Sequence, residues 1–160
     1  MYILSCQEQE EWQMLDFYKK QLFAEALADV FIITYDRLRR YEGEWHLEKG
    51  ILFPRKIFFE SRGREALKDE LSRLSGKGNP LVRVEGKDET LLRNLCGPEK
   101  HLKMSRGVIR KGAAEITEGP LRGNENRICK IDRHKRLARL GFDGHDLGNV
   151  WAGLEILEKE

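Results

Sequence analysis

The chain has 160 residues, enough for one ordinary domain or two small ones. Forty per cent of the residues are apolar, which suffices for hydrophobic cores, although no apolar run approaches the ~20 residues of a membrane span. Charged residues make up 35% of the chain, but the net charge is only +2, so any nucleic-acid binding must come from local clustering of basic residues.

The N-terminal quarter predicts a strand followed by a helix. Residues 2–6 form a short apolar run typical of a buried strand, and no basic segment typical of a signal peptide precedes it. An amphipathic helix follows, with acidic residues in its first turn and lysines later, as suits its dipole. Its apolar stripe comprises Trp12, Leu15, Tyr18 and Leu22.

Strand character dominates the next segment. Residues 29–41 are rich in β-branched and aromatic side chains, and strand character resumes at 44–47 after a Glu-Gly turn. Residues 51–60 predict a long strand in which Pro54 implies an edge, a bulge or a strand end, because proline has no N–H for the ladder. The strand-like segments 29–41 and 44–47 predict a hairpin that carries Arg37, Arg39, Arg40, Trp45 and His46. A solvated hairpin is the favoured interpretation, and contact with DNA or RNA phosphates is the alternative.

A second helix is predicted at residues 61–76, with Ser61 as a possible cap and Gly76 at its stop. A strand at residues 81–85 and a short helix capped by Asp88 follow. The Gly-Pro and basic residues after Leu95 then read as a linker.

Beyond this linker the sequence predicts only strands. Five short strand-like segments, separated by Gly- and Asn-containing turns, suggest a small barrel. We therefore expect an α+β N-terminal domain, with an antiparallel sheet flanked by helices, over residues 1–100. A linker over residues 101–106 and an all-β barrel over residues 107–160 complete the expected organisation.

A cluster of positive charge distinguishes residues 118–140 from the rest of the chain. Gly119, Pro120 and Gly123 predict a turn, and a second turn is predicted at residues 132–136. Six Lys or Arg residues and His134 lie between Arg127 and Arg139, and they are opposed only by Asp132 and no other acid. Charge on a hairpin most often serves solvation and edge protection. Its density here makes a nucleic acid or another polyanion a serious alternative.

The stretch "EGPLRGNENRICKIDRHKRLARL" resembles the KOW motif of the NusG family of transcription factors, whose chain closes with an SH3-like barrel. The first half is similar to that family's N-terminal (NGN) domain in its opening strand "MYILSC", its helix, its basic hairpin and its Leu-Phe-Pro strand. Together, "GPLRG", "KIDRHKR" and "AGLEI" most resemble the specialised antiterminators of the family. Two departures are Lys56, where the family strand has an aromatic residue, and Asn126, where many KOW motifs have glycine.

The resemblance implies a transcription elongation and antitermination factor with two binding surfaces. The N-terminal domain would bind the clamp helices of RNA polymerase through an exposed aromatic group rimmed by charge, formed by Ser5, Phe53, Lys56 and Phe58. The KOW domain would bind a structured leader RNA, and upstream DNA would lie nearby. The implied RNA-binding residues are Arg122, Asn124, Lys130, Arg133, His134, Lys135, Arg136 and Arg139.

Two other functions compete with this one. The KOW domain could bind a ribosomal protein or a termination factor, as in a general elongation factor of the family, or the chain could be a ribosomal-protein-like KOW protein. Catalysis is not expected, because the sequence has no phosphate-binding glycine loop and no nucleophile motif. The histidines and Cys6, Cys96 and Cys129 lack metal-ligand spacing, so we expect no metal site and no cofactor. The cysteines are odd in number and widely separated, which favours reduced thiols in a cytoplasm. We also expect a monomer.

Overall fold

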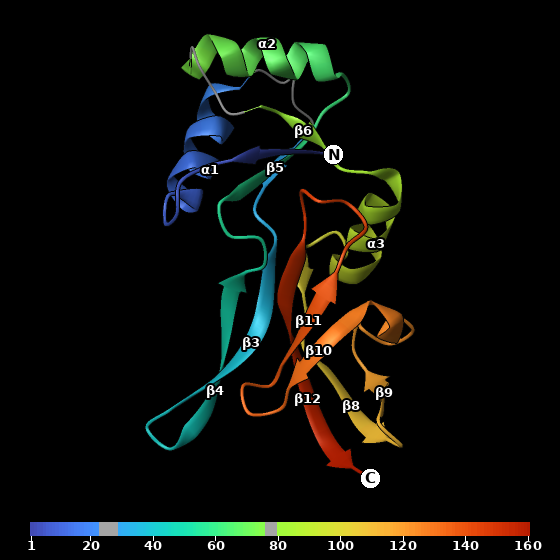
Figure 1. Cartoon of the computed structure of the whole chain (residues 1–160). Helices are drawn as coiled ribbons and strands as arrows, with labels where there is room; N and C mark the ends of the chain where they lie inside the picture. The colour runs from blue at the N-terminus through green and yellow to red at the C-terminus, as the bar shows by residue number, and fades with distance from the viewer. Residues whose placement is uncertain (23–28, 76–79) are drawn as a thin grey trace. The chain divides into compact units, whose positions relative to one another are not determined.

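The computed structural model describes residues 1–22, 29–75 and 80–160, and the chain forms two compact units (Figure 1). The first unit comprises residues 1–32 and 53–85, and the second comprises residues 33–52 and 86–160. Residues 33–52 of the N-terminal half therefore pack with the C-terminal strands. The predicted helix stop at Gly76 lies outside the described residues. The predicted domain ranges, 1–100 and 107–160, remain a prediction.

The first unit contains a four-stranded antiparallel sheet and two helices. From edge to edge, the sheet consists of β2 (Asp29–Phe31), β5 (Lys56–Glu60), β1 (Tyr2–Ser5) and β6 (Val82–Arg83). The helices are α1 (Glu11–Gln21) and α2 (Arg64–Ser75). Leu15 and Tyr18 of the predicted apolar stripe are buried, whereas Trp12 is 56% exposed, so its predicted place in the buried stripe is wrong.

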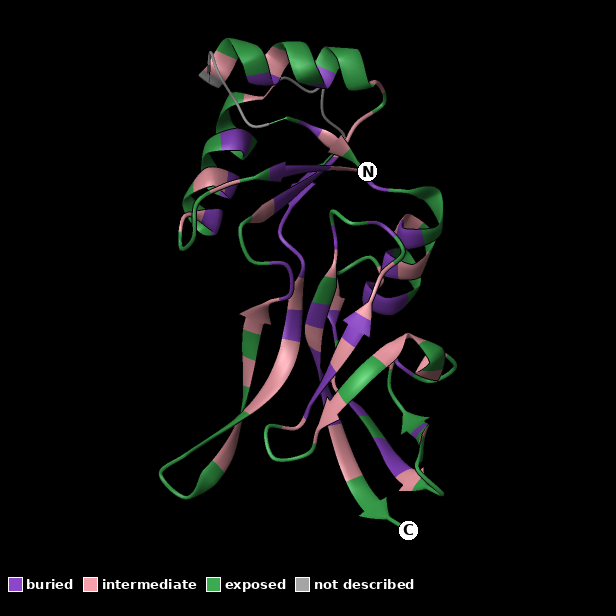
Figure 2. Cartoon of the chain, viewed as in Figure 1, coloured by how far each residue is buried: buried purple, intermediate pink, exposed green. Residues whose placement is uncertain are grey.

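Strand β5 is buried on both of its faces. Ile57, Phe58 and Phe59 alternate in direction along the strand, yet each is fully buried (Figure 2). The Tyr18 ring of α1 packs edge-on against Phe59 at 5.4 Å, and Phe31 of β2 stacks on Phe58 at 5.7 Å. Both faces of β5 thus belong to the core.

The predicted long strand over residues 51–60 is interrupted. Strand β4 (Glu44–Ile51) ends at Ile51, and β5 begins at Lys56. Pro54 lies in the turn between them, and Arg55 has a φ of +65°. The strand end is therefore the alternative that the structure supports, because a turn leaves the missing N–H of proline without consequence.

The second unit contains a three-stranded sheet, a helix and a five-stranded sheet. The first sheet has the order β4, β3 (Thr34–Tyr41) and β7 (His101–Leu102), and the helix is α3 (Gly86–Cys96). The five-stranded sheet has the order β10 (Ile128–Asp132), β11 (Leu137–Gly141), β12 (Asn149–Lys159), β8 (Ser105–Arg110) and β9 (Ala113–Glu118).

Each of the five strands expected in the C-terminal part is present, and a 3-10 turn, η1 (Glu125–Arg127), precedes β10. Within the described residues, the outer strands β9 and β10 do not pair with each other, so the sheet is open. Closure into an SH3-like barrel stays a prediction. The segment predicted as a linker, residues 101–106, contains β7 and the start of β8.

The five-stranded sheet has an apolar face and a face that meets β3. The apolar face includes the paired residues Ala138 and Ala152, and Leu140 and Val150, all of which are buried. On the opposite face, a Cβ added to Gly153 would collide with the backbone oxygen of Asp36 in β3. Glycine at this position therefore lets β3 and β12 approach each other closely.

Polar side chains join the remaining parts of the second unit. The two ring nitrogens of His101 each lie 2.7 Å from an oxygen, one of Thr34 and one of Asp36. The prediction that Asp88 caps α3 is wrong. Asp88 lies within the first turn of the helix and is buried, and its carboxylate accepts backbone N–H groups from Asp143 at 3.0 Å and Gly144 at 2.8 Å. The loop after β11 is thereby tied to α3.

No helix in the described ranges combines the length and the apolar content needed to cross a membrane. The thiols of Cys6, Cys96 and Cys129 are free. Cys96 is buried in α3, while Cys129 is exposed on β10.

Candidate nucleic-acid interface

The turn between β10 and β11 presents basic side chains to solvent. The Asp132 carboxylate accepts the backbone N–H of Lys135 at 3.0 Å, which closes the turn in the way that Asp commonly does. Arg133, His134 and Lys135 are exposed. Three residues predicted to bind RNA therefore lie together at one tip, and the acidic side chain beside them is engaged in shaping the turn.

Arg136, at the end of this turn, already has partners within the protein. One of its terminal nitrogens lies 2.8 Å from a carboxylate oxygen of Glu155 on β12. Its guanidinium carbon lies 4.0 Å from the centre of the Trp45 ring on β4. This geometry corresponds to a cation–π contact, which is strongest with tryptophan. Arg136 is thus suited to hold the turn against the β3–β4 hairpin rather than to bind RNA freely.

Lys130 and Arg139 lie behind the tip on one face of the sheet. Lys130 is opposite Arg139 in the pairing of β10 with β11, and Arg139 is opposite Trp151 in the pairing of β11 with β12. Directly opposed residues of antiparallel strands share a face. Trp151 lines a cavity of about 270 Å³ together with Tyr35, Arg37, Asp132, Lys135 and Leu137.

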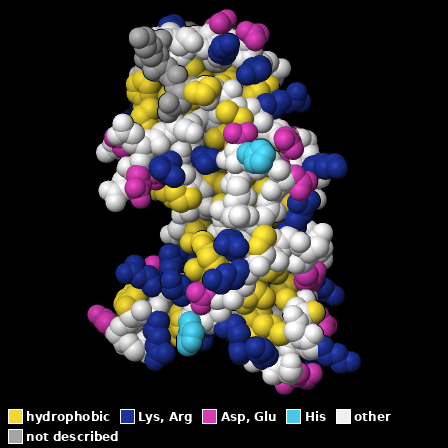
Figure 3. Space-filling view, in the orientation of Figure 1, with side chains coloured by type: hydrophobic (Ala, Val, Ile, Leu, Met, Phe, Trp, Pro, Cys, Tyr) yellow, Lys and Arg dark blue, Asp and Glu magenta, His cyan; other side chains and the backbone are white. Residues whose placement is uncertain are grey.

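A second cavity, also of about 270 Å³, joins the β3–β4 hairpin to the tip. Its lining includes His134 and Lys135 from the tip and four consecutive residues of β3 from Arg37 to Arg40, together with Trp45. Figure 3 shows Lys and Arg side chains gathered over this part of the molecule. We refer to this site as the basic–aromatic surface, defined by Arg37, Arg40, Trp45, His134 and Lys135.

Charge on the basic–aromatic surface is only partly balanced by acids. Arg39 has Glu48 at 3.8 Å, and Arg136 has Glu155. In the described part of the chain, Arg37, Arg40 and Lys135 form no salt bridge, and the buried Nε of Arg37 has no hydrogen-bond partner. Unpaired cations beside an aromatic ring are suited to phosphate and base contacts.

The hairpin also carries a second aromatic pair. Tyr41 and His46 stack with ring centres 3.7 Å apart and planes 9° apart. Neither Tyr41 nor His46 lines the cavity that Arg40 and Trp45 line. Tyr41 is 41% exposed.

Arg122 and Asn124 are not brought to the tip. They precede β10, whereas the tip follows it, so the five residues of β10, ~16 Å at strand spacing, separate the two groups. The Asn124 side chain donates to the backbone oxygen of Pro120 at 3.3 Å. Nearby backbone N–H groups of Glu125 itself and of Gly123 lower the pKa of the Glu125 carboxyl, which places a negative charge beside Arg122.

The expected polymerase-binding residues divide into two buried and two accessible ones. Ser5 is opposite Lys56 in the pairing of β1 with β5; Ser5 is exposed and Lys56 is half-buried. Phe53 and Phe58 are only 2% and 0% exposed, and their rings lie 5.4 Å apart in the core. The expectation of an exposed aromatic group at Phe53 and Phe58 is therefore wrong, because both rings pack in the core, where Phe31 also stacks on Phe58.

Exposed aromatic side chains occur elsewhere in the first unit. Trp12 and Phe17, both on α1, are 56% and 39% exposed. Sequence periodicity assigned Trp12 to the buried stripe and did not single out Phe17. An apolar spacing of three or four residues marks a helix face but does not tell how wide the covered stripe is.

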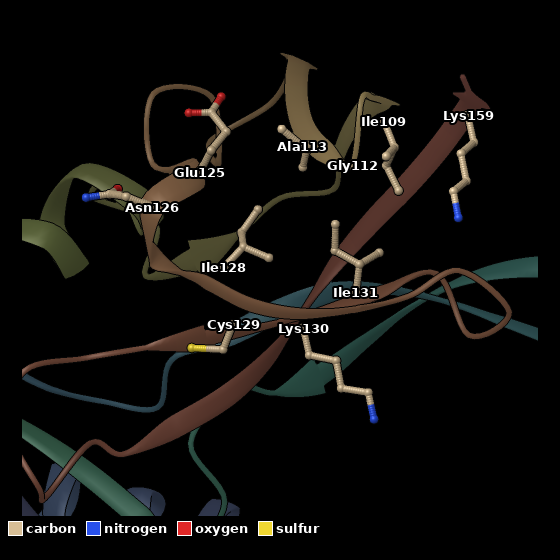
Figure 4. A pocket seen from close by; sticks show the side chains of 11 residues that line it. Ile109, Gly112, Ala113, Glu125, Asn126, Ile128, Cys129, Lys130, Ile131 and Lys159 are labelled. Atoms are coloured by element: carbon tan, nitrogen blue, oxygen red, sulfur yellow. The ribbon is translucent and has the colours of Figure 1, made fainter.

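The largest of these cavities, of about 590 Å³, lies between β10 and the β8–β9 pair (Figure 4). Ile128 and Ile131 point to the side on which Ile109 and Ala113 lie, whereas Cys129 and Lys130 point to the opposite side of β10. Its lining combines isoleucine and alanine side chains with four polar or charged residues, Glu125, Asn126, Lys130 and Lys159. The sequence signal for this cavity is the pattern of isoleucines in β8 and β10, which by itself indicates only a sheet face.

Comparison with known proteins adds no family to these observations: neither the family models nor the curated proteins that were compared match this chain.

Proposed function

We propose that this protein is a transcription elongation and processive antitermination factor of the NusG type, most like the specialised antiterminator LoaP. The observation that carries the proposal is the convergence of Arg37, Arg40, Trp45, His134 and Lys135 around one cavity. The likeness of residues 118–140 to a KOW motif supports it. The protein would act in the cytoplasm by binding alone, without a cofactor or a covalent step.

In this proposal, the basic–aromatic surface binds a structured leader in the nascent transcript. A-form RNA hides its base edges in a deep, narrow groove, so recognition would rely on phosphates and on a loop or bulge. Capture of the transcript raises the effective concentration of the factor beside the polymerase that made it. Ser5 and Lys56 are the accessible members of the set proposed to meet the polymerase clamp.

Antitermination would follow from differential binding. A factor that binds the closed clamp more tightly than the open, paused state shifts the population toward elongation. The shift can be no larger than the difference between the two affinities.

Single-round transcription through an intrinsic terminator tests the proposal. Purified RNA polymerase would be assayed with and without the protein, on templates with the native upstream leader or a scrambled one. Readthrough that rises only with the native leader is expected. An equal effect on both templates would instead indicate a general elongation factor, and no effect on either would refute the proposal.

Phosphate binding by the basic–aromatic surface has its own test. A filter-binding titration of the leader RNA should show a steep salt dependence, with a slope of roughly −0.7 to −0.9 per phosphate contact. Arg40→Ala and Lys135→Ala should each weaken binding and reduce the slope by about one contact. Lys68→Ala, an exposed change on α2, is the matched control and should leave both unchanged.

The cavity between β10 and the β8–β9 pair favours a second candidate function. Ile109, Ile128 and Ile131 line it between β8–β9 and β10, and β9 and β10 each have a strand partner on one side only in the described residues. A protein segment, from a ribosomal protein or a termination factor, could bind there by strand addition. Ile131→Asp would then abolish that binding while leaving RNA affinity intact.

A further inference from the structure

We propose that the β3–β4 hairpin forms half of the RNA site, and that the cavity between this hairpin and the β10–β11 turn receives one unpaired nucleotide. The inference rests on the proposed function and adds to it the kind of RNA feature that is recognised. Three of the residues that line this cavity, Arg37, Arg40 and Trp45, lie outside the segment that resembles a KOW motif.

The chemistry of the cavity lining matches the two parts of a nucleotide. An unpaired base exposes a flat π face, and Trp45 and His134 offer aromatic rings at the cavity. The phosphates carry negative charge, and Arg37, Arg40 and Lys135 line the same cavity without a salt bridge to a carboxylate in the described residues. The cavity volume of about 270 Å³ lies just below the ~300 Å³ at which small-ligand pockets commonly begin, which suits one base better than a base pair with its backbones.

The positions of the two lining segments are linked to each other. Arg136 connects the turn to the hairpin through Trp45, and it connects the turn to β12 through Glu155. Close approach of β3 to β12 at Gly153 holds the base of the hairpin. Since both sides of the cavity are held before RNA arrives, binding does not have to order them, which lowers its entropic cost.

Two RNA probes test the inference directly. A labelled ten-nucleotide oligouridylate presents unpaired bases, and a ten-base-pair RNA duplex presents phosphates without them. Trp45→Ala should weaken binding of the oligouridylate by about tenfold or more, as loss of one stacked base predicts. Duplex binding should change less than twofold. Arg40→Ala should weaken binding of both probes, because both carry phosphates.

Matched variants separate stacking from folding. Trp45→Phe keeps an aromatic ring and should recover most of the oligouridylate affinity, while His134→Ala should weaken the single strand selectively without touching the Arg136 contact. Tyr41→Ala removes an aromatic ring of the same hairpin that does not line the cavity and should have no effect. Urea unfolding of each variant would identify any loss that comes from the fold.

The outcomes distinguish this inference from the proposed function. Equal losses on both probes with Trp45→Ala and His134→Ala, or a loss with Tyr41→Ala alone, would overturn the unpaired-nucleotide site. If these variants also retain full leader-dependent readthrough, antitermination stands and only the inference fails. If the wild-type protein gives no leader-dependent readthrough, the proposed function fails, whichever probe is bound.

Discussion

The guanidinium carbon of Arg136 lies 4.0 Å from the centre of the Trp45 ring, while a terminal nitrogen of Arg136 lies 2.8 Å from Glu155. One side chain thus links the β10–β11 turn to both β4 and β12. It brings together two groups of basic residues, the hairpin and the turn, that are far apart in the sequence.

The Arg136–Trp45 contact should be measurable in a double-mutant cycle. We expect Arg136→Ala and Trp45→Ala to be coupled by ~0.5–1 kcal/mol in the free energy of unfolding, the range for partly exposed cation–π pairs. Urea titrations of the wild type, both single variants and the double variant would give this value. Replacing Arg136 and Tyr41 together is the control pair, and strictly additive effects for Arg136 and Trp45 would contradict the assignment.

Gly153→Ala should destabilise the second unit. The added methyl group would collide with the backbone oxygen of Asp36 and with the Met104 sulfur, so β3 would have to move away from β12. We expect a loss of ~1–3 kcal/mol, as is usual for overpacking. Gly86→Ala, at the start of α3, meets no atom within 4 Å and is the control, with little or no loss expected in thermal unfolding.

Asp88→Asn tests the buried carboxylate in α3. The Asp88 oxygens accept two backbone N–H groups, and an amide would place an N–H₂ donor against one of them. A buried donor left without an acceptor costs ~1–3 kcal/mol, so the free energy of unfolding should fall by about that amount. Amide hydrogen exchange should speed up at Gly144. Asp146→Asn, in the same loop but exposed, should change neither quantity.

Phe58→Ala should lower the free energy of unfolding rather than remove a surface contact with polymerase. Phe58 is fully buried between Phe31 and Phe53, and removing a buried phenyl ring costs ~3–5 kcal/mol. Ser5→Ala and Lys56→Ala should change stability by less than ~0.5 kcal/mol. A polymerase pull-down at a temperature where Phe58→Ala is still folded would then report on the surface alone. Full stability in Phe58→Ala would contradict its place in the core.

Thiol chemistry should separate the cysteines by burial. Burial raises the pKa of the Cys96 thiol to about 12, so at pH 8 Cys96 should react with a disulfide reagent only after unfolding. Exposed Cys129 should react in the native protein. Burial, followed by the charges of Glu11 and Glu10, also raises the pKa of Cys6, which should slow its reaction.

The same pKa shift links stability to pH. The unfolded thiol of Cys96 ionises near its ordinary value of 9.0, whereas the folded thiol does not ionise until about 12. The contribution of the Cys96 thiol to the free energy of unfolding is therefore fully present below pH 9 and is lost as the pH rises from there toward 12. Cys96→Ala should flatten this part of the stability profile, and an unchanged profile would show that Cys96 is not its cause.

Secondary structure in the C-terminal part could be predicted because its signals are local. Alternating apolar residues and the Gly- and Asn-containing turns act over a few residues, and each of the five expected strands is present. The burial of Phe58 could not be predicted in this way. Strand alternation assigns Phe58 and Phe59 to opposite faces, but it does not tell that Phe53 packs against Phe58 on one face and Tyr18 against Phe59 on the other.

By itself, the sequence determined that the hairpin at residues 34–51 and the turn at residues 132–136 are basic and that turn residues shape both. Only the tertiary structure decided that Arg40 and Lys135 line one cavity, that Arg136 is occupied by Trp45 and Glu155, and that Arg122 lies at the other end of β10. The physical reason is that charge and turn propensity are properties of neighbouring residues. Contact between distant segments depends on how their faces pack, here through the close approach of β3 and β12 at Gly153.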